Sequence, residues 1–326
     1  MRPTRARCRL PGCVLGLALM TTVLAAQQDS EVHVLHVQGN VAMLVGAGGN
    51  IAVQVGSDGA LIVDTGTAQM ADQVIATVKQ LARPVTNKPL RFIINTHFHA
   101  DHTGGNEKAR AAGATITGGN VAGNIADAAE GAAIYAHENV MKRLSTPDGA
   151  QPATPSGGWP TDTYFGDRQE LFFNGEAIQM FHPKSAHTDS DSIVFFRRSD
   201  VVLTGDIFST TGYPVIDLQH GGSINGLIDA LNFILDITIP AEKQEGGTMV
   251  IPGHGRLCDE ADVVEYRDMV TIIRDRIQDM IKKGMTLEQV KAAKPTRDYD
   301  PLYGATTGPW TTDMFVEAVF RSLTAK

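Results

Sequence analysis

The sequence predicts an α/β protein in which two β-sheets pack together and helices cover their outer faces. Short β-like stretches and amphipathic helical stretches follow one another in the order strands, helix, strands, helix, in both halves of the chain. Neither a linker nor a shift in composition separates the two halves. We therefore expect a single domain over residues 27–326, with helices at its carboxyl end.

The composition is that of an ordinary globular protein. Of the 326 residues, 43% are hydrophobic and 20% are charged, which is enough apolar material for a large core. The formal net charge is −8 at pH 7. A chain of this charge is not expected to bind nucleic acid or anionic lipid through simple electrostatics. We expect a small-molecule substrate, and the sequence sets no oligomeric state.

Residues 1–26 are expected to be a secretory signal peptide. Four arginines precede an apolar run at residues 14–24, and Ala25 and Ala26 offer a cleavage point. The run is short for a membrane-spanning helix, although an uncleaved anchor is the alternative. Cleavage would remove the four arginines, change the formal net charge from −8 to −12, and leave Cys258 as the sole cysteine. We expect a periplasmic or secreted protein without stable membrane association.

The first half begins with predicted hairpins. Stretches rich in Val, Ile and Leu are separated by Gly and Asn turns, and they predict strands at residues 32–37, 41–45, 51–55 and 61–63. A helix is expected over residues 69–81 and a strand over 91–94. A further strand and helix are expected at residues 115–116 and in the alanine-rich stretch 121–142.

A long loop, residues 145–168, follows the first half. It is rich in Pro, Gly and Thr, and it is too long for a plain connector. Its aromatic side chains, Trp159 and Tyr164 among them, make it a candidate substrate flap. A surface insertion that packs on itself is the alternative.

The second half repeats the order of elements. Predicted strands lie at residues 171–173, 177–181, 192–196, 201–203 and 249–251. Three helices have recognisable N-terminal signals: Ser223, Asp259, and a capping box formed by Thr286 and Gln289. A helix over residues 313–323 closes the chain.

The strongest chemical signal is the segment His97-Phe98-His99-Ala100-Asp101-His102, directly after a predicted strand. Three histidines and an aspartate so close together converge if the chain turns sharply, and Gly104 and Gly105 allow that turn. Imidazole and carboxylate are ligands that zinc prefers outside thiolate sites. Because four ligands are too many for one tetrahedral ion that also uses distant residues, the cluster indicates two ions side by side.

The segment resembles the HxHxDH motif of the metallo-β-lactamase superfamily. The segments 61–66, 186–188, 204–206 and 252–255 resemble the family's other motifs, in the family's order. The resemblance covers most of the chain after residue 32. It implies an αβ/βα sandwich of two mixed β-sheets flanked by helices, with the metals at one edge of the sheets.

The resemblance also implies a ligand set for two Zn²⁺ ions. The first zinc would bind His97, His99 and His187, the second would bind Asp101, His102 and His254, and Asp206 would bridge the ions or lie close to both. Asp101 would also orient the nucleophile.

Further residues are assigned around this set. Asp64 is expected to be buried and to orient a ligand loop, and Asp191 is expected to do the same unless it is a solvated turn residue. Ser209 and Tyr213 lie where some relatives contact substrate, although a plain loop role fits them equally.

The resemblance implies an exported dizinc hydrolase that uses a metal-bridging hydroxide to cleave a carbonyl substrate: an amide, a lactone or a related ester. A true β-lactamase is the runner-up, and Ile207 argues against it because a serine is expected at that position in the nearest subclass. A thioesterase similar to glyoxalase II and a non-catalytic metal-binding or relay protein are further alternatives.

Overall fold

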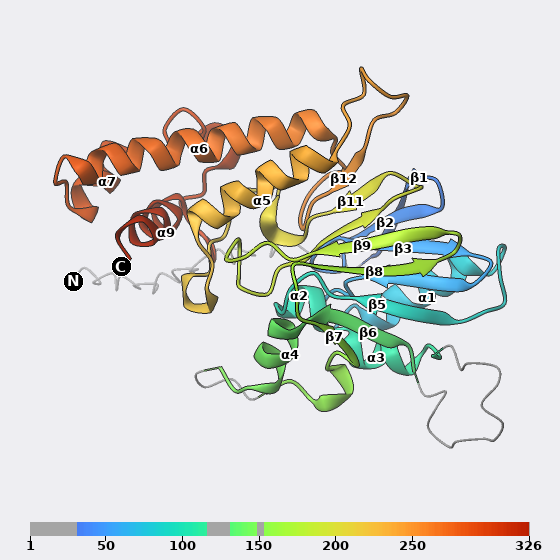
Figure 1. Cartoon of the computed structure of the whole chain (residues 1–326). Helices are drawn as coiled ribbons and strands as arrows, with labels where there is room; N and C mark the ends of the chain where they lie inside the picture. Colours follow the sequence, from blue (N-terminus) through green and yellow to red (C-terminus); the bar gives the residue numbers. More distant parts are fainter. Residues whose placement is uncertain (1–30, 116–130, 149–152, 326) are drawn as a thin grey trace, which may run out of the picture.

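The computed structural model describes residues 31–115, 131–148 and 153–325 and consists of two β-sheets with helices on their outer sides (Figure 1). The expected signal peptide, residues 1–26, lies outside the described residues. Within the described ranges, no helix combines the length and the apolar character that crossing a membrane requires.

The first sheet has seven strands in sequence order, β1-β2-β3-β4-β5-β6-β7. Neighbouring strands are antiparallel from β1 to β4 and parallel from β4 to β7. The strands are β1 (His33–Gln38), β2 (Val41–Val45), β3 (Ile51–Gly56), β4 (Gly59–Val63), β5 (Leu90–Ile94), β6 (Ala133–His137) and β7 (Asp162–Tyr164).

The second sheet has five strands in the order β12-β11-β10-β9-β8. Its pairs are antiparallel except for β11 and β12, which are parallel. The strands are β8 (Arg168–Phe173), β9 (Glu176–Phe181), β10 (Ile193–Phe196), β11 (Val201–Leu203) and β12 (Met249–Ile251). Both sheets are therefore mixed, as expected for the predicted fold class.

Helices cover the outer face of each sheet. On the first sheet these include α1 (Ala71–Ala82), α3 (Asn106–Ala111) and α4 (Glu138–Ser145). The short helix α2 (Ala100–Thr103) lies between β5 and α3 in the chain. Figure 1 shows α5, α6 and α9 on the other side of the molecule. The carboxyl-terminal helices are α5 (Ile224–Ile237), α6 (Glu260–Lys282), α7 (Leu287–Ala293), α8 (Asp300–Tyr303) and α9 (Thr312–Thr324). Short 3₁₀ turns are η1 (Ser156–Gly158), η2 (Gly205–Ile207) and η3 (Leu218–His220).

Three apolar clusters hold these layers together. Side chains such as Met43 and Phe196 fill the space between the two sheets. Val78 of α1 belongs to an apolar cluster on the outer face of the first sheet. Leu231 of α5 and Val270 of α6 belong to an apolar cluster on the outer face of the second sheet. Burial of these large apolar surfaces is the main stabilising contribution to the sandwich. The predicted αβ/βα sandwich is confirmed.

The predicted helix starts agree with the structure. The side chains of Ser223, Asp259 and Thr286 each accept a hydrogen bond from a backbone N–H in the first turn of their helix. Thr286 and Gln289 form the expected capping box. Each cap satisfies a backbone donor that would otherwise have no partner within the helix.

The alanine-rich stretch 121–142 is not the single helix that the sequence predicted. Part of it lies outside the described residues, but Ala133–His137 form the buried strand β6, and helix α4 begins only at Glu138. A parallel strand inside a sheet is apolar on both faces, so its sequence lacks the alternation that identifies exposed strands.

Two aromatic residues of the predicted flap, Trp159 and Tyr164, are packed into the protein, whereas Phe165 is exposed. Tyr164 is buried in β7, where its hydroxyl lies 2.7 Å from Ser192 Oγ. Trp159 packs against a small cluster that includes Val140 of α4, and its Nε1 donates to the carbonyl of Thr154 at 2.7 Å. For Trp159 and Tyr164, these contacts favour an insertion that packs on itself over a substrate flap.

A stacked histidine pair should make the stability depend on pH. The rings of His137 and His182 stack at 3.5 Å, and burial together with the neighbouring His182 lowers the pKa of His137 from 6.5 to about 4. The unfolded chain therefore binds a proton in a range where folded His137 stays neutral, and the free energy of unfolding should fall as pH drops from about 6.5 to about 4. Melting temperatures over this range should fall less steeply for His137→Phe, which keeps a ring but cannot titrate. Parallel curves for the two proteins would contradict this assignment.

Candidate metal centre

The residues of the predicted ligand set come together at one edge of the two sheets. His97 follows the carboxyl end of β5, Asp206 follows β11, and His254 follows β12. His187 lies in the loop between β9 and β10. Strands that end at the same edge therefore deliver side chains from four distant parts of the sequence to one place.

Seven side chains form two neighbouring groups. In each group, one nitrogen or oxygen atom per residue lies within 4.8 Å of the others. The first group is His97, His99, His187 and Asp206, and the second is Asp101, His102 and His254. The structure thus brings together all seven residues named from the sequence.

Hydrogen bonds outside the cluster fix which nitrogen of each ring faces inward. His187 Nδ1 lies 2.7 Å from the carbonyl oxygen of Val215, and His99 Nε2 lies 3.1 Å from Asp217 Oδ2. Carbonyl and carboxylate oxygens only accept hydrogen bonds, so these ring nitrogens carry the hydrogen. In each neutral ring the other nitrogen then presents a lone pair to the cluster.

The inward nitrogens face one another without a proton between them. His187 Nε2 lies 3.1 Å from His99 Nδ1, and a ring that donates through its outer nitrogen has no second hydrogen to place between them unless it takes up a proton. His97 Nε2 is buried and has no hydrogen-bond partner among the described residues. Buried acceptors with no donor are costly, and a shared cation relieves that cost. The donor set therefore fits a metal ion.

Asp206 lies between the two groups. Its Oδ2 is 3.9 Å from His97 Nε2 and 3.8 Å from His187 Nε2. Its Oδ1 is 3.1 Å from His102 Nε2 and 3.4 Å from His254 Nε2. Each carboxylate oxygen thus faces a different group. Oδ1 is buried and, despite these short distances, makes no hydrogen bond of acceptable geometry within the described chain.

The pKa shifts within the cluster also indicate a site that needs positive charge. Burial works against the charged form of Asp206, yet His102 and His254 hold its pKa well below the usual range. Burial likewise opposes the charged form of His254, but the neighbouring carboxylates of Asp101 and Asp206 raise its pKa to about 9. The two carboxylates of the cluster are thus balanced by protons on His102 and His254, where metal ions would otherwise supply positive charge.

Two glycines let the chain approach the cluster closely. A Cβ atom at Gly253 would overlap Asp206 Oδ1, and one at Gly49 would overlap the ring of His102. Because only glycine lacks this atom, both positions are restricted by contact with the cluster.

Asp64 is hydrogen-bonded to His102 of the cluster and to Thr96, the residue before His97. It is buried, and its carboxylate accepts from Thr96 N at 2.8 Å, from Thr96 Oγ1 at 2.7 Å and from His102 Nδ1 at 2.8 Å. Its φ of 66° places the carboxylate at the end of β4, in a conformation that Asp and Asn adopt more readily than most residues. Asp64 thus joins the ring of His102 to the backbone that leads into His97.

Asp191 is buried and is not a solvated turn residue. Its carboxylate accepts from Thr188 N at 2.9 Å and from Thr188 Oγ1 at 2.7 Å, and burial raises its pKa. Since Thr188 directly follows His187, these bonds hold the loop that presents the His187 ring.

Sequence reasoning missed a second polar chain, formed by Asp217 and His220. Asp217 Oδ2 contacts both His99 Nε2 and His220 Nδ1, the latter at 2.6 Å, and His220 Nε2 lies 3.1 Å from Asp148. The signal was the pair Asp217 and His220, spaced three residues apart directly after the apolar Val215 and Ile216. Such spacing is also common in ordinary turns, so it did not stand out.

Asp217→Asn should weaken metal binding by about tenfold, the low end of the effect of residues that orient ligands. One oxygen of Asp217 accepts from the backbone N–H of His220, and the other faces the rings of His99 and His220. In the amide, an NH₂ group replaces one of these oxygens and cannot accept a hydrogen bond. Either the backbone N–H of His220 or the two rings therefore lose their acceptor. Competition with a metal chelator measures the change. Asp148→Asn is the matched control, because Asp148 contacts His220 but has no contact with His99 in the described structure. Equal effects of the two variants would contradict this role.

A cavity of about 340 Å³ opens beside the cluster. Of the four candidate substrate-contacting residues, Ser209 and Tyr213 line it, and Trp159 and Tyr164 do not. Its opposite wall comes from the segment around α8 and α9, which contributes Tyr303, Ala305, Trp310, Thr311 and Thr312. The cavity can therefore hold a small molecule against His99, Asp101 and His254.

Tyr213 is fixed in this wall. Its ring stacks on Phe315 at 4.7 Å, and its hydroxyl donates to Asp300 Oδ1 at 2.9 Å. Ile207 is fully buried and does not line the cavity.

Solved structures with the same architecture have low sequence identity to this chain. The stereoselective inverting sec-alkylsulfatase Pisa1 from a Pseudomonas species is 16% identical with a TM-score of 0.61, and the match covers 89% of this chain and 50% of that one. The chain thus spans half the length of the alkylsulfatase. A metallo-beta-lactamase from Pontibacter korlensis is 15% identical with a TM-score of 0.53, covering 74% of this chain and 99% of that one. For the B3 metallo-beta-lactamase BLEG-1 the identity is 20%, the TM-score 0.51 and the coverages 68% and 94%.

A sequence comparison with curated proteins gave no match. Residues 44–254 match the family model described as the metallo-beta-lactamase superfamily, and this segment carries the whole cluster from His97 to His254. Since the match spans more than half of the sequence, the chain belongs to the metallo-beta-lactamase superfamily, a family of metal-dependent hydrolases.

Proposed function

We propose that the protein is a dizinc hydrolase that cleaves an uncharged carbonyl substrate, a lactone, an ester or an amide. The observation that supports two ions is the position of Asp206, whose two carboxylate oxygens face different groups of ligands. His97, His99 and His187 would hold one Zn²⁺, Asp101, His102 and His254 would hold the other, and Asp206 would bind both. Histidine and carboxylate ligands without cysteine suit zinc in catalytic sites.

The protein's own residues prepare the site for hydrolysis. Bound zinc would supply Lewis-acid activation of a carbonyl group and of water. The side chain of Asp101 is 38% exposed and lines the cavity, so it can accept a hydrogen bond from an attacking water molecule and fix its direction. Asp64 and Asp217 hold the rings of His102 and His99, so little reorganisation is needed during the reaction.

The lining of the cavity supports an uncharged substrate. Among the residues that line it in the described structure there is no lysine and no arginine. Val215, Tyr303 and Trp310 give it an apolar side opposite the acidic Asp101. β-Lactam antibiotics carry a carboxylate, which would find no side-chain cation here, and so a lactone or neutral ester fits better than the β-lactamase alternative.

We further propose that residues 27–326 act as one exported domain. The apolar cluster outside the second sheet includes residues from Ala186 to Val319, so the carboxyl-terminal helices share a core with the sheet. The basic, then apolar, pattern of residues 1–26 supports export.

The test is a comparison of four substrates with the zinc-loaded protein from residue 27 onward: an alkyl lactone, an aryl acetate, a chromogenic cephalosporin and a secondary alkyl sulfate. We expect the two uncharged substrates to reach a kcat/KM of about 10⁴ M⁻¹s⁻¹ or more, and a chelator to abolish turnover until zinc is restored. Preference for the cephalosporin would instead establish the β-lactamase alternative. No turnover of any substrate with two ions bound would overturn the proposal.

A further inference from the structure

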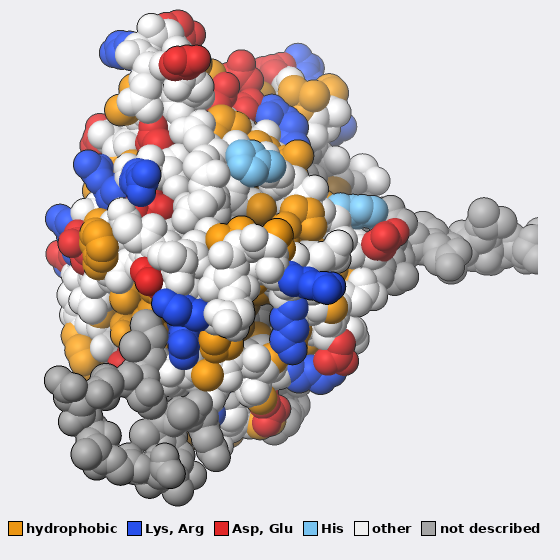
Figure 2. Space-filling view, turned by 90° about the vertical axis from the view of Figure 1, so that its right-hand side faces the viewer, with side chains coloured by type: hydrophobic (Ala, Val, Ile, Leu, Met, Phe, Trp, Pro, Cys, Tyr) orange, Lys and Arg blue, Asp and Glu red, His pale blue; other side chains and the backbone are white. Residues whose placement is uncertain are grey.

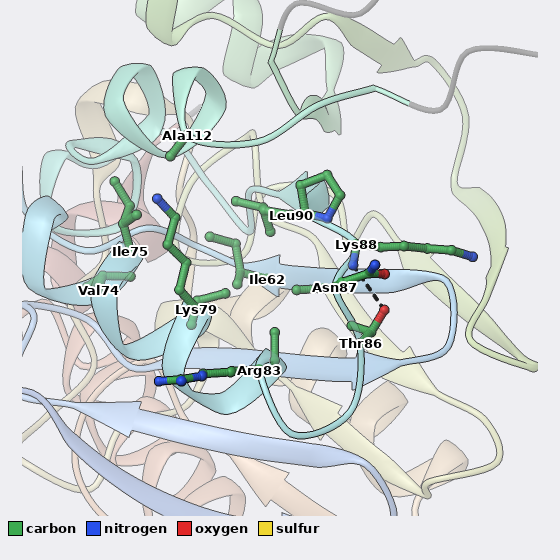
Figure 3. A pocket seen from close by; sticks show the side chains of 14 residues that line it. Ile62, Val74, Ile75, Lys79, Arg83, Thr86, Asn87, Lys88, Leu90 and Ala112 are labelled. Atoms are coloured by element: carbon green, nitrogen blue, oxygen red, sulfur yellow. Dashed lines mark hydrogen bonds between the residues drawn. The ribbon is translucent and has the colours of Figure 1, made fainter.

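A second cavity lies far from the metal centre, beneath helix α1. Its volume is about 360 Å³, within the range of ligand pockets. Ala60 and Leu90, which line it, lie near the amino ends of β4 and β5, whereas the metal cluster lies past the carboxyl end of β5 (Figure 3). Since no residue lines both cavities, the two sites are separate.

The interior of this cavity is apolar. Ile62 from the sheet and Val74 and Val78 from α1 form its buried floor, together with Leu90. Figure 3 shows Ile75 on the same side of the helix and Ala112 across from it. No buried polar side chain lies in the floor, so the cavity favours a hydrocarbon group over a polar one.

The mouth of the cavity is basic. Lys79, Arg83 and Lys88 line it, and none of its lining residues is acidic. This contrasts with the formal net charge of −8 for the whole chain. Figure 3 shows the Lys79 side chain reaching past the cavity toward Ala112. Figure 2 shows Lys and Arg side chains beside hydrophobic ones across the middle of this end of the molecule.

The basic residues are free to bind an anion. Among the described residues neither Lys79 nor Arg83 has an ion-pair partner, and Lys88 lies 3.9 Å from Asp58 in a loose, exposed pair. Lys79 and Arg83 near the carboxyl end of α1 also complement the helix dipole. The helix dipole does not account for Lys88, which lies outside the helix. It also does not account for the apolar cavity beneath Lys79, Arg83 and Lys88.

We propose that this cavity binds a free medium-chain fatty acid, with its alkyl chain against Ile62, Val74 and Val78 and its carboxylate at Lys79. An apolar cavity with a basic mouth is complementary to a molecule that has one anionic end and one hydrocarbon end. The proposal does not depend on the metal centre or on the hydrolase activity.

Calorimetric titration with decanoate tests the proposal, on both zinc-loaded and chelator-treated protein. We expect equal binding to both forms, because the site lies away from the metals. Decyltrimethylammonium, with the same chain and the opposite charge, should bind much more weakly. Lys79→Glu should weaken decanoate binding by about tenfold, as expected for loss of a charge-assisted hydrogen bond. Lys142→Glu on α4 is the matched charge reversal away from the cavity and should change binding little.

Ala112→Phe tests by steric means whether the ligand occupies the cavity. Figure 3 shows Ala112 at the cavity beside the end of the Lys79 side chain, so a phenyl ring there should fill space that decanoate needs and weaken its binding. Binding to the zinc-loaded form alone would show decanoate at the metals and overturn the proposal. So would equal losses for Lys79→Glu and Lys142→Glu. Binding to phosphatidylglycerol vesicles without binding to decanoate would identify a lipid surface as the partner instead.

Discussion

Asp206→Ala should lower kcat/KM for any substrate of the enzyme by at least about a thousandfold, in line with the several kcal/mol that metal catalysis supplies. The reason is the central position of the Asp206 carboxylate, which faces His97 and His187 on one side and His102 and His254 on the other. If the proposed two-zinc centre is right, its removal should also lower the metal content below two ions per chain, as measured by elemental analysis of the purified variant.

The control for this variant is Asp236→Ala, which removes an exposed carboxylate on α5. It should keep full activity and full metal content. If Asp206→Ala kept both ions and lost only activity, Asp206 would act on the substrate and not as a shared ligand. If it kept both ions and full activity, the proposed metal centre would be wrong.

Asp64→Asn should weaken metal binding by about 10- to 100-fold and lower the stability of the metal-free protein by roughly 3 kcal/mol. The carboxylate accepts three hydrogen bonds from Thr96 and His102, and an amide cannot accept all three. If the amide nitrogen takes the place of Oδ2, His102 Nδ1 must become an acceptor. Its Nε2 then carries the hydrogen and no longer offers a lone pair to a metal.

Asp64→Asn isolates the effect of the side-chain hydrogen bonds, because Asn tolerates the positive φ of 66° at this position. Backbone strain therefore adds little to the result. Chelator competition measures the metal affinity, and urea denaturation of the metal-free protein measures the stability. A loss of stability with unchanged metal affinity would mean that Asp64 supports the fold without orienting His102.

The ligand residues could be named from the sequence because the segment from His97 to His102 and three shorter segments downstream resemble the ligand motifs of the family. The spacing of His97, His99, Asp101 and His102 carries the information locally, and the fold brings Asp206 to them at the same sheet edge. Helix starts such as Ser223 were predictable for the same reason, since an N-cap depends only on its first turn.

Other parts of the site depend on tertiary packing and left little local signal. Asp217 matters because η3 places it against His99, a residue more than a hundred positions earlier in the chain. Trp310 and Tyr303 line the cavity because α9 packs on α6, which no local pattern in their own segment indicates. Strand β6 was read as part of a helix because its two faces are both apolar.

The cavity beside the cluster has two walls of different origin. One carries the metal-ligating side chains and belongs to the segment that matches the family model, residues 44–254; the other is built by residues 303–312, beyond that segment. The outer wall is held in place by contacts of its own, such as the packing of the Tyr303 ring against the rings of Tyr213 and Tyr266. Substitutions confined to residues 303–312 should therefore change the shape of the cavity while leaving the candidate ligand residues in place. For protein engineering, a library in this segment is the natural place to alter which molecules fit beside the cluster.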